Sequence, residues 1–193
     1  MDIKNLISNK GNILDGVFII EPKIFEDNRG FFYESWNSLS FSAKVTKTNF
    51  CQDNHSSSSK GVLRGIHYQL NPYAQGKLIR CTKGIIFDVA IDLRKNSPTF
   101  KEWASIELNE TNKYILWIPE GFGHGFLTLS DFAEVQYKVT KRWDKESEKS
   151  ILWNDPELSI DWPLNQIDDE LLVSEKDSNG LTIKQAEELN YIF

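Results

Sequence analysis

Short apolar runs, most with alternating apolar and polar residues, fill the first two thirds of the 193-residue chain. We assign them to residues 16–21, 31–36, 46–54, 62–69, 77–81, 85–93, 103–108, 113–118, 126–129 and 133–140. Alternation with a period of two places successive side chains on opposite faces of a β-strand. Turn residues such as Gly, Pro, Asn and Asp separate most of the runs. Short strands at this spacing predict an all-β sandwich or barrel rather than βαβ units.

The turns between these runs predict how the strands connect. Residues 27–30 would form a hairpin turn with Arg29 near its tip, and residues 83–84 would join the strands on either side into a second hairpin. The serine run at residues 56–59 indicates a flexible polar loop. Short peripheral helices are expected at residues 37–44 and 182–189, where Thr182 is a suitable N-cap. Without repeats or a boundary, residues 1–193 are predicted to form one domain, with residues 1–13 as an N-terminal extension.

Composition and charge exclude several classes of function. The net charge of −6 provides no broad basic field, so nucleic-acid binding is not expected. Cys51 and Cys81 are too few for a disulfide framework. No apolar run reaches membrane-spanning length, and the first residues lack the apolar core of a signal peptide, so we expect a cytoplasmic protein without membrane contact. A local cationic pocket for an anionic ligand is still compatible with this charge; its candidates are Arg29, Arg64, Lys77 and Arg80.

Residues 60–80 concentrate the groups that could carry chemistry. Strict alternation would place Arg64 on one face of a strand, with Val62, Ile66 and Tyr68, and His67 on the other, with Leu63, Gly65 and Gln69. Both faces would then carry polar groups, and polar groups directed into a sheet interior usually line a cavity. His67 is a candidate general base because its ordinary pKa lies near neutrality.

A histidine base needs a partner for its second ring nitrogen, and a carboxylate serves well. Asp88, Asp92 and Asp177 are all candidates, and periodicity does not distinguish them. Tyr137 could supply a proton from an opposite wall, and Lys77 could stabilise an oxyanion.

A metal site is a weaker interpretation of the same residues. His67 and His124 are available, but the strand of His67 offers no second imidazole, and the nearby Lys77 would repel a cation. The sequence also lacks a nucleophile elbow and the glycine-rich phosphate loops. We therefore predict a site without metal or cofactor.

Several stretches, in the same order throughout, resemble the dTDP-4-dehydrorhamnose 3,5-epimerase family. They are residues 29–32, 52–56, 60–69, 74–78, 87–94, 117–126, 153–156, 160–163 and 174–177, so the resemblance spans about residues 14–181. It implies a cupin-like jelly roll with a few short helices, including one near the C-terminus. It also implies a dTDP-sugar substrate, no metal and no cofactor.

The resemblance assigns roles residue by residue. It implies that His67 is the proton acceptor, Asp177 the acid that orients it, Tyr137 the proton donor and Lys77 the cation that faces the C4 oxygen of the sugar. His124 would be a further sugar contact, held by Asp88. The remaining positions implied for nucleotide-sugar binding are Arg29, Glu34, Gln52, Asp53, Asn54, Arg64, Glu148 and Lys176.

One segment departs from the family pattern. After Tyr137 the family usually has an aromatic pair and a proline, whereas residues 141–145 read Lys-Arg-Trp-Asp-Lys. This segment is expected to lie near the base or sugar pocket, so the departure leaves open which nucleotide is bound and whether one or two centres are epimerised. Three hypotheses follow: a 3,5-epimerase, a single-centre epimerase or isomerase of a related sugar, and a non-catalytic sugar-nucleotide-binding cupin. A homodimer is expected because the family forms one.

Overall fold

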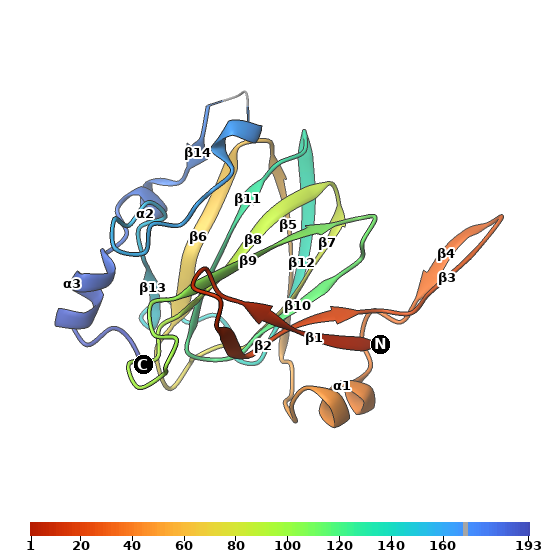
Figure 1. Ribbon diagram of the computed structural model, residues 1–193, viewed down its shortest axis with the longest axis horizontal. Helices are drawn as coiled ribbons and strands as arrows, with labels where there is room; N and C mark the ends of the chain where they lie inside the picture. Colours follow the sequence, from red (N-terminus) through yellow and green to blue (C-terminus); the bar gives the residue numbers. More distant parts are fainter. Residues whose placement is uncertain (168–169) are drawn as a thin grey trace.

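The computed structural model describes residues 1–167 and 170–193. Two antiparallel sheets face each other and enclose a barrel-like interior (Figure 1). In spatial order, the first sheet contains β1 (Asp2–Ile7), β2 (Ile13–Glu21), β10 (Ile115–Ile118), β7 (Lys77–Lys83), β12 (Phe132–Val139) and β5 (Gln52–Ser59). The second contains β13 (Glu148–Ser150), β6 (Val62–Gln69), β11 (Phe122–Thr128), β8 (Ile85–Asp92) and β9 (Trp103–Asn109), with β14 (Leu172–Val173) parallel to β6. The all-β prediction is confirmed.

The remaining elements lie outside this barrel. β3 (Ile24–Asp27) and β4 (Gly30–Tyr33) form a separate two-stranded hairpin that projects away from the two sheets (Figure 1). The helices are short: α1 (Ser38–Lys44), α2 (Glu175–Ser178), α3 (Ile183–Glu188) and the 3-10 turn η1 (Leu164–Gln166). Both predicted helices are confirmed, and Thr182 caps α3 in a reciprocal capping box with Gln185. Within the described residues no helix is long and apolar enough to cross a membrane.

Two apolar layers position the second sheet. Its inner face packs against the first sheet through buried residues such as Ile79, Ala90 and Phe126. Its outer face, which includes Ile66, is covered by the C-terminal segment with Ile183. Burying apolar surface on both faces fixes the position of this sheet, and with it that of β6 and β11.

Two expected connections are wrong. The strands around Lys83 and Gly84 do not form a hairpin, because β7 pairs with β10 and β12 while β8 pairs with β9 and β11. The chain crosses from one sheet to the other at Gly84, which has a φ of +76°. A Cβ on Gly84 would lie 2.1 Å from the carbonyl oxygen of Phe132, so only glycine fits there. Residues 56–59 are not a loop either, since they continue β5 and pair with β12 through Ser59↔Phe132.

The strand boundaries near residues 31–54 also differ from the prediction. β4 ends at Tyr33, and β5 begins only at Gln52, so residues 46–51 are not strand. The aromatic side chains in this region pack as an irregular cluster instead, with Trp36 and Phe50 ring centroids 4.8 Å apart and both near Phe41.

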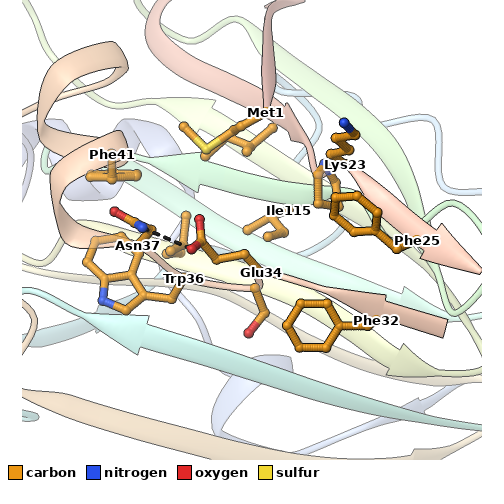
Figure 2. A pocket seen from close by; sticks show the side chains of 13 residues that line it. Met1, Lys23, Phe25, Phe32, Glu34, Trp36, Asn37, Phe41 and Ile115 are labelled. Atoms are coloured by element: carbon orange, nitrogen blue, oxygen red, sulfur yellow. Dashed lines mark hydrogen bonds between the residues drawn. The ribbon is translucent and has the colours of Figure 1, made fainter.

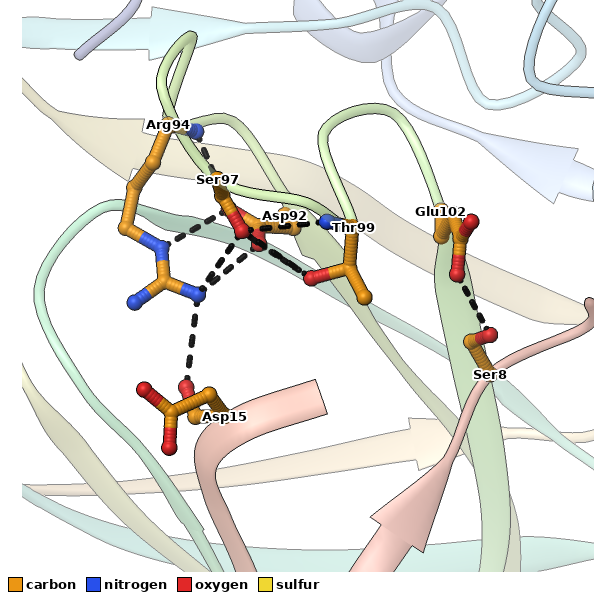
Figure 3. A network of polar contacts seen from close by, with 7 residues as sticks. All are labelled: Ser8, Asp15, Asp92, Arg94, Ser97, Thr99 and Glu102. Carbon is orange, nitrogen blue, oxygen red and sulfur yellow. Dashed lines mark hydrogen bonds and ion pairs between the residues drawn. The ribbon is translucent and has the colours of Figure 1, made fainter. Parts of the chain in front are cut away.

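A polar network surrounds Asp92 at the end of β8 (Figure 3). Asp92 is fully buried and accepts hydrogen bonds from Arg94, Ser97 and Thr99. Arg94 also lies over the ring of Phe122, 4.5 Å from its centroid. This network ties the loop after β8 to the start of β11.

Candidate active site

His67, on β6, is held by a carboxylate from the C-terminal part of the chain. Its Nε2 lies 2.5 Å from Oδ1 of Asp177, in the one-turn helix α2. The other oxygen of Asp177 accepts the backbone N–H of Gly65 at 3.3 Å, and Ser174 caps α2 by accepting the N–H of Asp177. With Nε2 bonded to the carboxylate, Nδ1 is the ring nitrogen of His67 that can accept a proton from a substrate.

The surroundings of Asp177 keep its carboxylate ionised. Asp177 is almost fully buried, and burial alone would raise its pKa. Hydrogen bonds from His67, Gly65 and Ser174, with the charge of His67, outweigh burial and hold the pKa of Asp177 below its ordinary value. A buried anion at this position stabilises the imidazolium that forms when His67 takes up a proton.

The structure thus selects one of the three carboxylates that the sequence left open as partners of His67. Asp177 bonds to it directly. Asp88 instead binds His124, whose Nε2 lies 2.9 and 3.0 Å from its two oxygens. Asp92 belongs to the polar network at the end of β8 (Figure 3).

Lys77 brings a buried ammonium group next to the base. It points inward from β7, and its Nζ donates to the backbone carbonyl of His67 at 3.1 Å. Burial lowers the pKa of Lys77 to about 8, against the opposing charges of Asp88 and Glu148. A cation at this depth can stabilise negative charge that develops on a nearby oxygen.

The buried surroundings of His124 favour the neutral form of its ring. Burial lowers its pKa, although the charge and the hydrogen bonds of Asp88 act in the opposite direction. In the neutral ring Nε2 donates to Asp88, so Nδ1 can accept a hydrogen bond from a sugar hydroxyl without adding a second positive charge beside Lys77.

Tyr137 reaches the cavity from the opposite sheet. It lies on β12, where it pairs with Asn54 of β5 and Ile79 of β7. Burial raises the pKa of Tyr137, so its phenol keeps a proton that it can donate, while the charge of Arg64 acts to lower the pKa. The cavity between the sheets measures about 140 Å³ and is lined by Gln52, Asn54, His67, Tyr68, Gln69, Gln75, Lys77, Tyr137, Trp143 and Glu148.

Arg64 lies on the inner face with His67, so the prediction that it shares a face with Ile66 and Tyr68 is wrong. Ile66 and Tyr68 belong to the outer apolar layer. Arg64 instead donates from Nε to Ser58 Oγ at 3.0 Å, across the gap between β6 and β5. The physical reason is a β-bulge in β6, which interrupts the alternation.

An ion pair and an amide border the cavity. Lys176 Nζ lies 2.6 Å from Glu148. Burial alone would raise the pKa of Glu148, but the hydrogen bond and the charge of Lys176 lower this pKa overall. Gln52 donates to Asn54 at 2.9 Å and accepts the backbone N–H of Trp143 at 3.0 Å. The walls thus combine a base, a cation, a proton donor and several groups able to bind hydroxyls.

The family model described as dTDP-4-dehydrorhamnose 3,5-epimerase matches residues 12–185. The chain belongs to this epimerase family. A dTDP-4-dehydrorhamnose 3,5-epimerase from Shigella flexneri is 55% identical over 165 residues, covering 85% of this chain and 89% of the relative. The resemblance seen in the sequence motifs is confirmed.

Solved structures of the epimerase family share the fold. The dTDP-6-deoxy-D-glucose-3,5-epimerase of Legionella pneumophila Philadelphia 1, in complex with dTDP-4-keto-L-rhamnose, is 41% identical with a TM-score of 0.89, covering 99% of this chain and 97% of that one. A 3'-monoepimerase from Streptomyces bikiniensis, in complex with dTDP-quinovose, is 34% identical with a TM-score of 0.86, covering 92% and 88%. The cupin-like fold expected for an epimerase of this family is confirmed.

Six of the predicted binding residues are not among those that line the cavity of His67: Arg29, Glu34, Asp53, Arg64, His124 and Lys176. Asp53 points to the outer side of β5 and pairs with Lys138 at 2.9 Å. Arg29 lies in the turn of the projecting β3–β4 hairpin, bonded to Asp27. Glu34 lies in a second cavity of about 270 Å³ at the base of this hairpin, where it accepts a hydrogen bond from Asn37 (Figure 2).

Four residues that line the cavity were not among the predicted site residues: Tyr68, Gln69, Gln75 and Trp143. Gln75 and Trp143 lie outside the strands, so alternation carried no signal for them. Trp143 belongs to the segment that departs from the family pattern, and this was the available hint. No group of three or more potential metal ligands occurs among the residues that the structure describes.

Proposed function

We propose that this chain is a cytoplasmic dTDP-4-dehydrorhamnose 3,5-epimerase. It would convert dTDP-4-dehydro-6-deoxy-D-glucose to dTDP-4-dehydro-L-rhamnose by inverting C3 and C5, in the route to dTDP-L-rhamnose. The observation that carries this proposal is the arrangement of His67 between buried Asp177 and buried Lys77, with Tyr137 on the facing sheet. A binding protein without catalysis would have no need for all four groups.

The reaction requires a proton to leave and a proton to return. The C4 ketone acidifies the hydrogens on C3 and C5, and His67 takes one of them while Asp177 stabilises the imidazolium. The electron pair moves onto O4 to form an enolate, which the ammonium of Lys77 stabilises. Tyr137 then donates its proton to the other face of the same carbon, and that centre is inverted. His67 then releases its proton and Tyr137 regains one by exchange with solvent, and repeating the steps at the second carbon completes the double epimerisation.

Binding of the nucleotide part rests on the polar groups around the catalytic residues. Arg64, exposed at its end and anchored to Ser58, is suited to a charge-assisted contact with the diphosphate. His124 and Asn54 would bind sugar hydroxyls, and Gln52, Glu148 and Lys176 would border the nucleotide.

We further propose that the enzyme is a homodimer in which the β3–β4 hairpin of one protomer completes the site of the other. The hairpin projects from the barrel (Figure 1), and its Phe25, Phe31 and Phe32 are 53%, 59% and 71% exposed. Such a cluster of exposed aromatic rings is typical of a surface that a partner covers. The hairpin also carries Arg29 in its turn, and Arg29 does not line the cavity of His67 in its own protomer.

The proposed activity is tested by following deuterium incorporation by NMR, in D2O, with the keto-sugar nucleotide as substrate. A 3,5-epimerase labels and inverts both C3 and C5. Label at C3 alone would instead identify a single-centre epimerase, the activity named for the Streptomyces bikiniensis relative. No label at either carbon would leave only sugar-nucleotide binding and contradict the proposal.

The dimer is tested by mixing two inactive variants, Arg29→Ala and His67→Ala. If Arg29 completes the site of the partner, half of the dimers are mixed and each has one intact site, so activity returns to about a quarter of wild type. No recovery after subunit exchange, or a monomeric mass in light scattering, would contradict it.

A further inference from the structure

Strand β6 directs Arg64 and His67 to the same side of the sheet although they are three residues apart. Their partners in β11 are Phe126 and His124, which are two residues apart. The extra residue of β6 is accommodated in a β-bulge between these two pairs. In a regular strand, residues at this spacing would point to opposite faces, so the two side chains could not lie on one face of the sheet.

Two glycines make the bulge sterically possible. Gly65 has a φ of +120°, and a Cβ there would lie 2.5 Å from the Cα of Gly125. A Cβ on Gly125 would lie 2.8 Å from the carbonyl oxygen of Arg64 and 3.3 Å from the Cα of Gly65. The backbones of β6 and β11 are therefore in contact at the bulge, with no room for a side chain on either strand.

The bulge also sets the position of the group that orients the base. The N–H of Gly65 donates to Asp177 at 3.3 Å. The next residue, Ile66, exchanges two backbone hydrogen bonds with Ile151. The bulged backbone thus faces the C-terminal segment and contacts the carboxylate that binds His67.

We propose that Gly125 is a positioning residue for the epimerisation. Because its Cα leaves room for the bulge of β6, Gly125 holds Arg64 and His67 on one face of the sheet and keeps the N–H of Gly65 on Asp177. Gly125 needs no contact with the substrate for this role. The inference rests on the proposed function, in which Arg64 binds the diphosphate and His67 accepts the proton.

The test compares Gly125→Ala with a matched change on the same strand, Gly123→Ala. The nearest atoms to a Cβ at position 123 belong to side chains, Ile66 Cγ2 at 2.6 Å and Leu93 Cδ1 at 3.3 Å, so this change disturbs packing against the side chain of Ile66 and not the backbone of the bulge. Two quantities are measured on each folded variant: the Kd for dTDP by calorimetry, and the rate of deuterium exchange into the keto-sugar nucleotide as a function of pH.

Gly125→Ala is expected to raise the Kd for dTDP by about 10- to 100-fold, the range of a lost charged hydrogen bond. It should also slow exchange by about tenfold or more and shift its pH profile, because the bond from Gly65 to Asp177 is disturbed. Gly123→Ala should change both quantities by less than about threefold, because it leaves the backbone of β6 in place.

A second variant separates the backbone clash from the packing clash. Ile66→Val, in the Gly125→Ala background, removes Cδ1, the side-chain atom that would lie 2.7 Å from the new Cβ. The proposal is overturned if this double variant regains wild-type affinity and rate, or if Gly125→Ala behaves like Gly123→Ala. It is also overturned if Gly125→Ala fails to fold in both backgrounds, since the contact would then serve the fold. A wild-type protein without exchange would instead contradict the proposed function, while the dTDP affinities would still test Gly125.

Discussion

Lys77 donates a hydrogen bond from Nζ to the backbone carbonyl of His67 at 3.1 Å, which places a buried ammonium group beside the proposed base. The same burial that brings the charge close to the reacting carbons also makes it easy to lose. The pKa of Lys77 is lowered from 10.5 to about 8. Its protonation state therefore changes within the range in which enzymes are usually assayed.

We predict that kcat/KM falls about tenfold per pH unit above pH 8, because neutral Lys77 no longer stabilises the enolate. Unfolding is not the cause of this fall. Between the pKa of Lys77 in the folded protein and its higher pKa in the unfolded chain, the unfolded chain binds more protons than the folded protein, so Lys77 makes the free energy of unfolding rise with pH. A pH–rate profile, with circular dichroism at each pH, measures both. The Lys77→Arg variant keeps its charge over this pH range. If this variant is active and its kcat/KM falls with pH as in wild type, the assignment of the fall to Lys77 is contradicted.

Tyr137→Phe should separate proton removal from inversion. The change deletes only a hydroxyl, so the fold should persist, with a stability cost of about 1–3 kcal/mol if a buried partner is left unpaired. His67 would still remove the proton, and the enolate would be reprotonated mainly on its original face. Deuterium should then enter the sugar faster than inverted product accumulates. If exchange and inversion fall by the same factor, Tyr137 is a packing residue and not the donor.

Asp177→Asn should remove the anion that stabilises the imidazolium while leaving the nucleotide contacts in place. We expect kcat to fall by about 10³- to 10⁴-fold, as when the carboxylate partner of another catalytic histidine is neutralised, with little change in the Kd for dTDP. Stopped assays and calorimetry measure the two. Asp88→Asn, which alters the partner of His124 instead, serves as a control and should affect kcat less. Equal losses in the two variants would show that Asp177 has no special relation to His67.

Arg94→Ala should destabilise the protein without changing the chemistry. It removes the cation from fully buried Asp92, and breaking a buried pair from one side costs about 3–5 kcal/mol. Burial raises the pKa of Asp92, but its hydrogen bonds lower it overall, so this stability is present near neutral pH and is lost as the pH falls through the acid range. Urea unfolding near neutral and at acid pH measures the difference. If the variant is as stable as wild type at both pH values, the ion pair of Arg94 and Asp92 does not stabilise the fold.

Alternation predicted the strands well because each strand has one face in a core, but it did not predict which strands pair. β7 and β8 follow each other in the sequence and lie in different sheets, and only the close approach of Gly84 to Phe132 shows where the chain crosses. The serines of residues 56–59 looked like a loop because their composition is polar. They are strand because β12 supplies the hydrogen bonds.

The site shows the same limit. His67 was identifiable from its residue type and setting, whereas its partner Asp177 is 110 residues away along the chain, and only the resemblance distinguished it from Asp88 and Asp92. The position of Arg64 was predicted wrongly because the bulge that turns it depends on Gly125, in another strand. The sequence of one strand does not indicate a contact with a residue in another strand.

The separation of His67 and Asp177 has a consequence for the order in which the protein becomes active. During synthesis, the barrel strands through β12 leave the ribosome before α2 does, so a barrel can assemble while His67 still lacks its partner. Bringing Asp177 to His67 closes a long loop, and the entropic cost is more than the one-turn helix α2 can offset alone. The apolar residues at the end of the chain, which pack on the second sheet, must provide the remaining stabilisation. Fraying of these last residues would therefore switch off proton transfer in a molecule whose sheets remain folded.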